Sequence, residues 1–301
     1  MSSPALTRDR VSSSAIMKYS RWDWIPAGLA VLHLFYVTGI FIAFPFMSWP
    51  VFIAAALLYS ISISWNINSI SHNFIHNPYF VSKRVNILFS YLLSVTLGFS
   101  QAMYNFVHMR HHSGNMDRPD ENGKVIDYLS IYKHGRDGKP ENVWAYTFLS
   151  FFREDPKEIF DRMSEKRPLE ARQGKRELAA MVSFYVLLGF LNWRFIVAIL
   201  PFYYLGHCLS ALNGYYEHFG ADPDKPIAWG VSTYDKLYNW TWMNNGYHAE
   251  HHYRPKQHWT KMRELHRQIE GRQQQEGVRV IRPPHPFGFL DPDLPHHESL
   301  G

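Results

Sequence analysis

The chain has 301 residues, of which 46% are hydrophobic, and a formal net charge of +5. Its single cysteine, Cys208, excludes an internal disulfide and any cysteine-rich zinc or iron–sulfur site. The basic excess is too small and scattered to indicate a nucleic-acid partner, and it suits polar segments that face an anionic membrane leaflet.

The N-terminal part predicts a flexible arm followed by a helical hairpin in the membrane. Residues 1–20 are rich in serine and basic side chains, and we expect them to be flexible. Residues 24–44 and 49–70 are uncharged apolar runs, each long enough to cross a bilayer, with Pro45 in the break between them. The turn lacks Lys and Arg while the flanking segments carry them, so the positive-inside rule places both ends of the hairpin in the cytoplasm.

Two more apolar regions follow. Residues 85–107 are uncharged but polar at their ends, and we expect them to be embedded in the membrane without crossing it. Residues 178–193 and 195–213 predict a second hairpin that turns at Asn192-Trp193-Arg194. The polar residues 113–176 between them must lie outside the hydrocarbon.

The predicted fold is all-α. It is an integral membrane helical bundle of two transmembrane hairpins, about four spans, with a cytosolic helical cap that carries three clusters of histidines. Residues 21–282 form one membrane domain in this prediction. Residues 283–301 contain too much proline for a regular element and are expected to be a flexible tail.

Seventeen histidines are present, and eight of them form the three clusters directly after the apolar segments. These are His72 and His76 in HNFIH, His108, His111 and His112 in HMRHH, and His248, His251 and His252 in HAEHH. On a helix, residues three and four apart share a face, so the imidazoles of each cluster point the same way. Imidazole is a good ligand for iron, copper, nickel and zinc, and eight such groups suit a pair of ions better than one.

The three clusters meet only if all of them lie on one side of the membrane. A third segment that crossed would carry the second cluster to the opposite side from the first. A segment that enters and returns brings the three clusters together, which is why we prefer that prediction for residues 85–107.

The order HxxxH, HxxHH and a late HxxHH, set between two membrane hairpins, resembles the membrane fatty acid desaturase superfamily, which also contains hydroxylases. The resemblance runs from about Trp24 to Ile269 and includes NNGYHAEHHYRPKQHW from Asn244. It implies a non-haem di-iron centre held by the eight clustered histidines. His218 in NGYYEHFG, thirty residues before His248, resembles a further ligand of that family and is the ninth candidate. The sequence departs from the family's pattern at two places. The first cluster, HNFIH, has no acidic residue beside its first histidine, and Tyr253-Arg254-Pro255 follows the last cluster where the family usually has Leu-Phe-Pro.

The same resemblance implies an O2-dependent oxidoreductase that introduces a double bond into a fatty acyl chain. The alternative is hydroxylation of an alkyl or lipid chain at the same centre. No HPGG haem motif is present, so electrons are expected from a separate ferredoxin, rubredoxin or cytochrome b5 type of donor with its reductase. We expect a multi-pass protein of a bacterial inner membrane, with the histidines on the cytoplasmic side.

Other function classes fit the histidines less well. A zinc hydrolase uses three ligands and a water, fewer than are present here. A metal transporter needs ligands along a path through the membrane, whereas these follow helix ends on one side.

The sequence leaves several supporting roles open. Glu217, Glu250 and Asp117 are candidates for orienting the imidazoles from behind. Trp65, Tyr104, Tyr215, Trp240 and Trp242 are candidates for lining an apolar substrate tunnel or for an interfacial aromatic belt. The basic stretches 166–176 and 254–267 are expected to contact either the electron donor or lipid headgroups.

Overall fold

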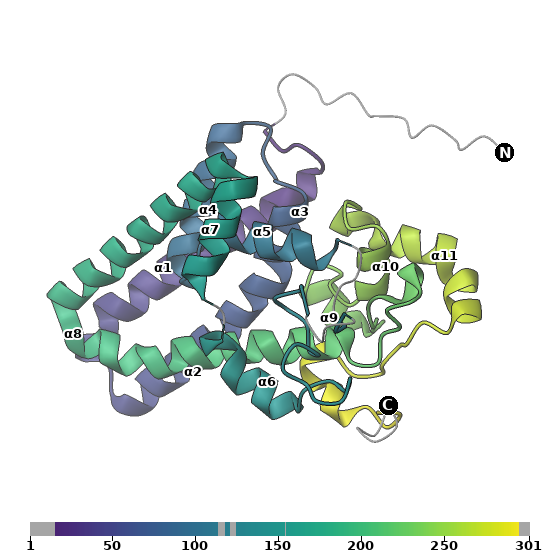
Figure 1. The fold of residues 1–301 in the computed structure, drawn as a ribbon. Coiled ribbons are helices and arrows are strands. Elements are labelled where there is room, and N and C mark those ends of the chain that lie inside the picture. The colour runs from purple at the N-terminus through teal and green to yellow at the C-terminus, as the bar shows by residue number, and fades with distance from the viewer. Residues whose placement is uncertain (1–15, 114–117, 121–124, 154, 295–301) are drawn as a thin grey trace.

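The computed structural model of the chain describes residues 16–113, 118–120, 125–153 and 155–294. Every regular element within these residues is helical, so the predicted all-α class is confirmed. Figure 1 shows long helices on one side and, beside their ends, short helices and loops that include α9, α10 and α11. Three helical stretches are long and apolar enough to cross a membrane, Arg21–Phe46, Trp49–His76 and Pro168–His218.

The first two long helices form the predicted N-terminal hairpin. Helix α1 (Trp24–Ala43) ends in a 3-10 turn, Phe44–Phe46, that contains Pro45, and α2 (Trp49–Trp65) starts with a proline in its first turn. Helix α2 then continues through a π-helical stretch, Asn66–Ser71, into α3 (His72–His76). A π turn inserts an extra residue into the helix and therefore rotates the residues after it, which sets the direction of the first histidine pair.

Helix α8 (Pro168–His218) consists of two arms joined by a sharp bend, visible in Figure 1. Asn192 leaves the helical conformation, with φ −158° and ψ 85°. Its side-chain oxygen accepts a hydrogen bond from the backbone N–H of Phe195 at 3.2 Å and so caps the second arm. The bend lies at the predicted turn, and the two arms supply the predicted second hairpin.

The third apolar region is a bent pair of helices, α4 (Lys83–Leu97) and α5 (Gln101–His111), which meet at 92°. Gly98 ends α4 with φ +79°, and a Cβ at this position would come within 2.3 Å of the Tyr203 hydroxyl. Both features require glycine at the bend. The bend is the geometry that a segment entering the membrane without crossing it needs.

A buried carboxylate fixes this bend. Glu177, on the first arm of α8, is fully buried. One of its oxygens accepts from the Ser90 hydroxyl at 2.6 Å, and the other accepts from the Ser100 hydroxyl at 2.7 Å and the Ala102 backbone N–H at 3.0 Å. The same carboxylate therefore binds the middle of α4 and caps the start of α5.

The rest of the described chain forms shorter helices, of which α6 is apolar. Helices α6 (Val143–Leu149) and α7 (Pro156–Lys166) precede α8, while α9 (Lys236–Thr241), α10 (His248–Tyr253) and α11 (Met262–Glu276) follow it. The last element is a 3-10 helix, His285–Leu290, that packs on α8.

The described part of the predicted flexible tail is ordered, which corrects the prediction for residues 283–294. His285 is fully buried and its Nε2 donates to the Val231 carbonyl at 2.9 Å. Gly288 approaches so closely that a Cβ there would lie 2.3 Å from the Tyr216 ring. Proline prevents long helices but is compatible with the first turn of a 3-10 helix, so its abundance did not indicate disorder here.

Candidate metal centre

The structure brings all nine predicted histidines together. They come from α3, from α5 and the residue after it, from the last residue of α8, and from α10. They form two groups, in each of which the potential ligand nitrogens lie within 4.8 Å of one another. The first group is His72, His76, His108, His112 and His251, and the second is His111, His218, His248 and His252.

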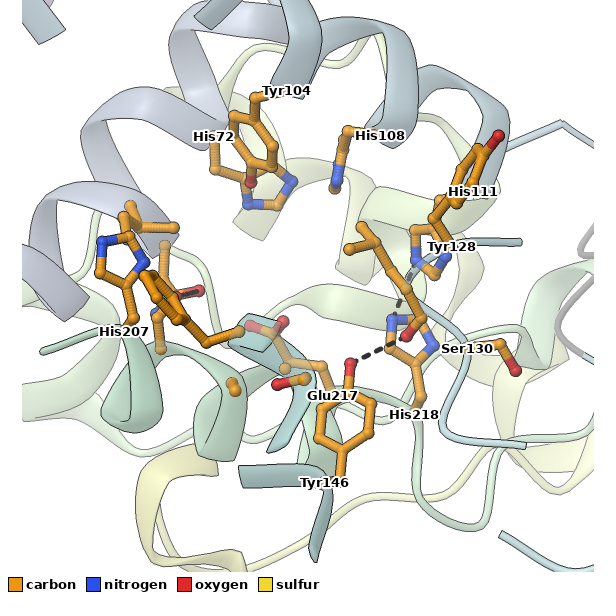
Figure 2. A pocket seen from close by; sticks show the side chains of 18 of the residues that line it. His72, Tyr104, His108, His111, Tyr128, Ser130, Tyr146, His207, Glu217 and His218 are labelled. Atoms are coloured by element: carbon orange, nitrogen blue, oxygen red, sulfur yellow. Dashed lines mark hydrogen bonds between the residues drawn. The ribbon is translucent and has the colours of Figure 1, made fainter. Parts of the chain in front are cut away.

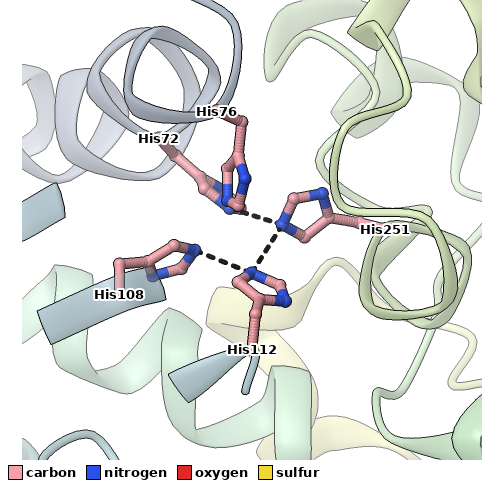
Figure 3. Close-up of side chains that lie close together, drawn as sticks. All are labelled: His72, His76, His108, His112 and His251. Carbon is pink, nitrogen blue, oxygen red and sulfur yellow. Dashed lines mark hydrogen bonds between the residues drawn. The ribbon is translucent and has the colours of Figure 1, made fainter. Parts of the chain in front are cut away.

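In the first group the ring nitrogens converge on a common centre, as Figure 3 shows. His251 Nε2 lies 2.9 Å from His72 Nε2 and 3.0 Å from His112 Nε2. His112 Nε2 is in turn 3.0 Å from His108 Nε2. A neutral imidazole carries only one N–H, so these contacts leave several lone pairs facing one another. A cation at the centre would satisfy them.

In the second group, which adjoins the first, ring nitrogens also lie close to one another. His218 Nε2 is 3.1 Å from both His111 Nε2 and His248 Nε2. Within the described residues, neither buried ring nitrogen of His252 has a hydrogen-bond partner. The ring centroids of His252 and His112 are only 4.3 Å apart, which links the two groups. Two adjoining sets of imidazole nitrogens fit a pair of metal ions, as the sequence predicted.

The protonation state also suits metal binding. Burial, followed by repulsion from neighbouring imidazoles, lowers the pKa of His248, His251 and His252 well below the usual value. These rings are therefore neutral at pH 7, the form in which imidazole binds a metal.

Two polar side chains behind the histidines fix ring orientation. The Asp127 carboxylate lies 2.6 Å from His111 Nδ1, and the Asn245 side-chain oxygen lies 3.2 Å from His72 Nδ1. Each oxygen accepts the Nδ1 hydrogen, which leaves Nε2 as the lone pair that faces the centre. Neither residue was predicted from the sequence, since nothing in their local sequence separates them from ordinary loop polar residues.

The three predicted supporting acids have different positions. Glu217 is buried and accepts from Asn245 Nδ2 at 2.7 Å, so it supports the contact to His72 indirectly. Glu250 lies on α10, but its carboxylate bonds to Ser232, Tyr234 and His266. Asp117 lies outside the described residues.

Replacing Asp127 by asparagine is expected to weaken metal binding or activity by about 10–100-fold, the usual effect of removing such an outer contact. The amide can present its oxygen or its nitrogen to His111, so the ring loses a fixed tautomer while its position is kept. Metal content after dialysis against a chelator measures the effect. Asp161→Asn, at an exposed ion pair on α7, is the matched control. Equal metal retention by wild type and Asp127→Asn would contradict the role of Asp127 in orienting His111.

The hydrogen bond between His266 and Glu250 predicts a pH-dependent stability. The 2.7 Å contact to the Glu250 carboxylate raises the pKa of His266. A raised pKa adds stability that is fully present below the unfolded value near 6.5 and is lost as the pH rises through the folded value. His266→Gln is therefore expected to lower the thermal midpoint at pH 6 by about 2–4 °C and by less at pH 9. An equal decrease at both pH values would contradict this assignment.

A cavity of about 250 Å³ borders both histidine groups, as Figure 2 shows. Its lining includes His72 and His108 from the first group and His111, His218 and His248 from the second. On another side it is lined by Phe99, Phe151 and His207. A hydrocarbon segment in this cavity would lie against both groups.

The candidate tunnel residues divide between several places. Tyr104 lines the histidine cavity, whereas Trp65, Trp240 and Trp242 line a separate one. Tyr215 is buried in a hydrophobic cluster with Ile131 and Leu212. His207 lines the histidine cavity, and its Nε2 donates to the Leu97 carbonyl at 3.1 Å across the helix bundle.

The sequence matches the model of one protein family, described as fatty acid desaturase, over residues 47–284. This span covers more than half of the chain and contains all nine histidines. No curated protein matches the chain. The match and the helices of membrane-spanning length identify a membrane oxidoreductase. The chain belongs to the fatty acid desaturase family.

Proposed function

We propose that this protein is a di-iron, O2-dependent desaturase that introduces a double bond into a fatty acyl chain. The observation that carries the proposal is the pair of adjoining imidazole groups that border one cavity. The family match supports the same reaction class. When bound, the two irons supply the electrons that activate O2 for attack on an unactivated C–H bond.

The protein's own residues hold and orient this centre. Five imidazoles would hold one iron and four would hold the other, with His112 and His252 adjacent at the junction. Asp127 and Asn245 select the tautomers of His111 and His72. The surrounding helices exclude water, since His108 and His248 are only 5% and 2% exposed.

The cavity sets what can reach the irons. At about 250 Å³ it lies below the roughly 300–1,000 Å³ of a typical ligand pocket, so it fits a segment of a chain and not a whole lipid. Phe99 and Phe151 offer apolar contacts to methylene groups. The reacting carbons would lie at the His72 and His218 side, where both groups of imidazoles are exposed to the cavity.

Electrons would arrive from a separate small carrier protein. The segment after the last histidine cluster contains Arg254, Lys256 and Arg267, which suits an acidic carrier of the ferredoxin, rubredoxin or cytochrome b5 type. Tyr253 directly follows His252, and the guanidinium carbons of Arg254 and Arg272 each lie 5.7 Å from its ring centroid. We assign this surface, on the cytoplasmic side of a bacterial inner membrane, to the electron donor.

Mass spectrometry of lipids from a host that expresses wild type or His111→Ala tests the reaction. A product lighter by two hydrogens, absent from the variant, is the expected result. A product heavier by one oxygen would instead establish a hydroxylase at the same centre. If wild type and variant give identical lipids although the purified wild type contains iron and the donor is supplied, the oxidative proposal is wrong.

A further inference from the structure

A second, larger cavity of about 800 Å³ shares none of its described lining with the histidine cavity. It lies where the start of α1 and the end of α2 meet the residues that follow α9 and the start of α11. Five of the ten tryptophans of the chain line it, Trp22, Trp65, Trp240, Trp242 and Trp259, and we call it the tryptophan cavity.

Hydrogen bonds between its walls hold the tryptophan cavity open. The Trp65 indole N–H donates to the Thr241 carbonyl at 2.9 Å, which joins α2 to the end of α9. The Trp259 indole N–H donates to the carboxylate of the fully buried Asp23 at 2.9 Å, which joins the turn before α11 to the turn before α1. Because both indole hydrogens are bonded to protein oxygens, the ring surfaces are left to contact a ligand.

The apolar side of this cavity opens toward the membrane. Ile25, Leu58 and Ile61 line it and are 45%, 55% and 50% exposed. They belong to the stretches Arg21–Phe46 and Trp49–His76, which are long enough to span the membrane. Hydrocarbon chains of the bilayer therefore have lateral access, and tryptophan is the residue that favours the boundary with the headgroups.

The polar rim of the tryptophan cavity is cationic. Arg263 lines the cavity, and the guanidinium carbon of Arg21 lies 5.5 Å from the ring centroid of Trp22. In the described part of the chain neither arginine forms an ion pair, whereas the nearby Lys261 is paired with Glu264 at 3.2 Å. The described lining also contains no acidic side chain. Guanidinium groups without carboxylate partners are well suited to a phosphate.

We propose that the tryptophan cavity binds an anionic phospholipid of the bilayer. Its phosphate contacts Arg21 and Arg263, and an acyl chain lies along Ile25, Leu58 and Ile61. This site is independent of the histidine centre and requires neither iron nor turnover. Inorganic phosphate lacks the chain and a zwitterionic lipid lacks the net charge, so both should bind more weakly.

Native mass spectrometry of the purified full chain in detergent tests the proposal. Dioleoyl phosphatidylglycerol is expected to bind more tightly than dioleoyl phosphatidylcholine. Arg263→Gln and Arg21→Gln should each weaken phosphatidylglycerol binding about fivefold, the factor that about 1 kcal/mol per basic residue corresponds to. The loss for phosphatidylcholine should be smaller, because its choline group offsets the charge of its phosphate. The control is Arg194→Gln, because Arg194 also lies beside a tryptophan, Trp193, but not at the cavity.

A second pair of measurements tests the location. The double replacement Leu58→Phe and Ile61→Phe fills the apolar side and should weaken binding of both lipids, while circular dichroism shows an unchanged helix content. Phosphatidylglycerol with brominated acyl chains should quench tryptophan fluorescence in wild type and less in the double variant. Equal affinity for the two lipids, an effect of Arg194→Gln as large as that of Arg263→Gln, or unchanged quenching in the double variant would each overturn the proposal.

Discussion

Replacing His251 by alanine is expected to abolish product formation and to reduce bound iron from two ions per chain to one. His251 contacts two other histidines of the first group. Its Nε2 lies 2.9 Å from His72 Nε2 and 3.0 Å from His112 Nε2. The second group does not use it and keeps its four nitrogens. The loss of activity should exceed the about 100-fold upper range for outer contacts, because a direct ligand is removed. Metal analysis of the purified protein and product formation measure the two effects.

His33→Ala is the matched control for this experiment. His33 is 5% exposed against 8% for His251, so its removal leaves a similar cavity. It lies on α1, outside both groups, where its Nδ1 accepts from Asn66 at 2.7 Å. The His33→Ala variant should therefore keep two irons per chain. If the His251→Ala variant still bound two irons, His251 would not be a metal ligand. If the wild type contained zinc and not iron, the proposed oxidant would be contradicted.

The parts of this site that follow local periodicity could be predicted from sequence. Histidines three and four residues apart share a helix face in any sequence, so the clusters themselves indicated converging ligands. The turn at Asn192 was also local, because a polar residue interrupts two apolar runs. His218 needed the family resemblance, since a single histidine at the end of a helix carries no signal of its own.

The contacts that support the ligands could not be predicted in this way. Asp127 reaches His111 from a loop, and Asn245 reaches His72 across 173 positions of sequence. Their roles depend on tertiary structure and not on a repeating pattern. The tail that contains His285 was predicted to be flexible, but His285 is buried. A proline-rich composition excludes long helices but does not exclude packing against a helix bundle.

Glu177→Ala is expected to lower the free energy of unfolding by about 3 kcal/mol, since each buried donor left without an acceptor costs about 1–3 kcal/mol. Most of this cost comes from the Ala102 N–H. A backbone N–H cannot rotate toward another acceptor, whereas the hydroxyls of Ser90 and Ser100 can. Helix α5 carries His108 and His111, so iron binding should weaken as the bend loosens. Denaturant unfolding in detergent, followed by circular dichroism, measures the stability.

Two variants separate this effect from a general loss of charge on α8. Glu177→Gln keeps an oxygen for the Ala102 N–H and the Ser100 hydroxyl, and its new amide group can donate to the Ser90 hydroxyl. It should therefore lose less than half as much stability as Glu177→Ala. Glu170→Ala removes a carboxylate that is 48% exposed and paired with Arg167, and such surface pairs contribute only about 0–1 kcal/mol. If Glu170→Ala proved as destabilising as Glu177→Ala, the carboxylate at position 177 would not be what fixes the bend. If Glu177→Ala unfolded like wild type but lost its iron, the bend would be held by packing around Gly98 and the carboxylate would act on the histidines alone.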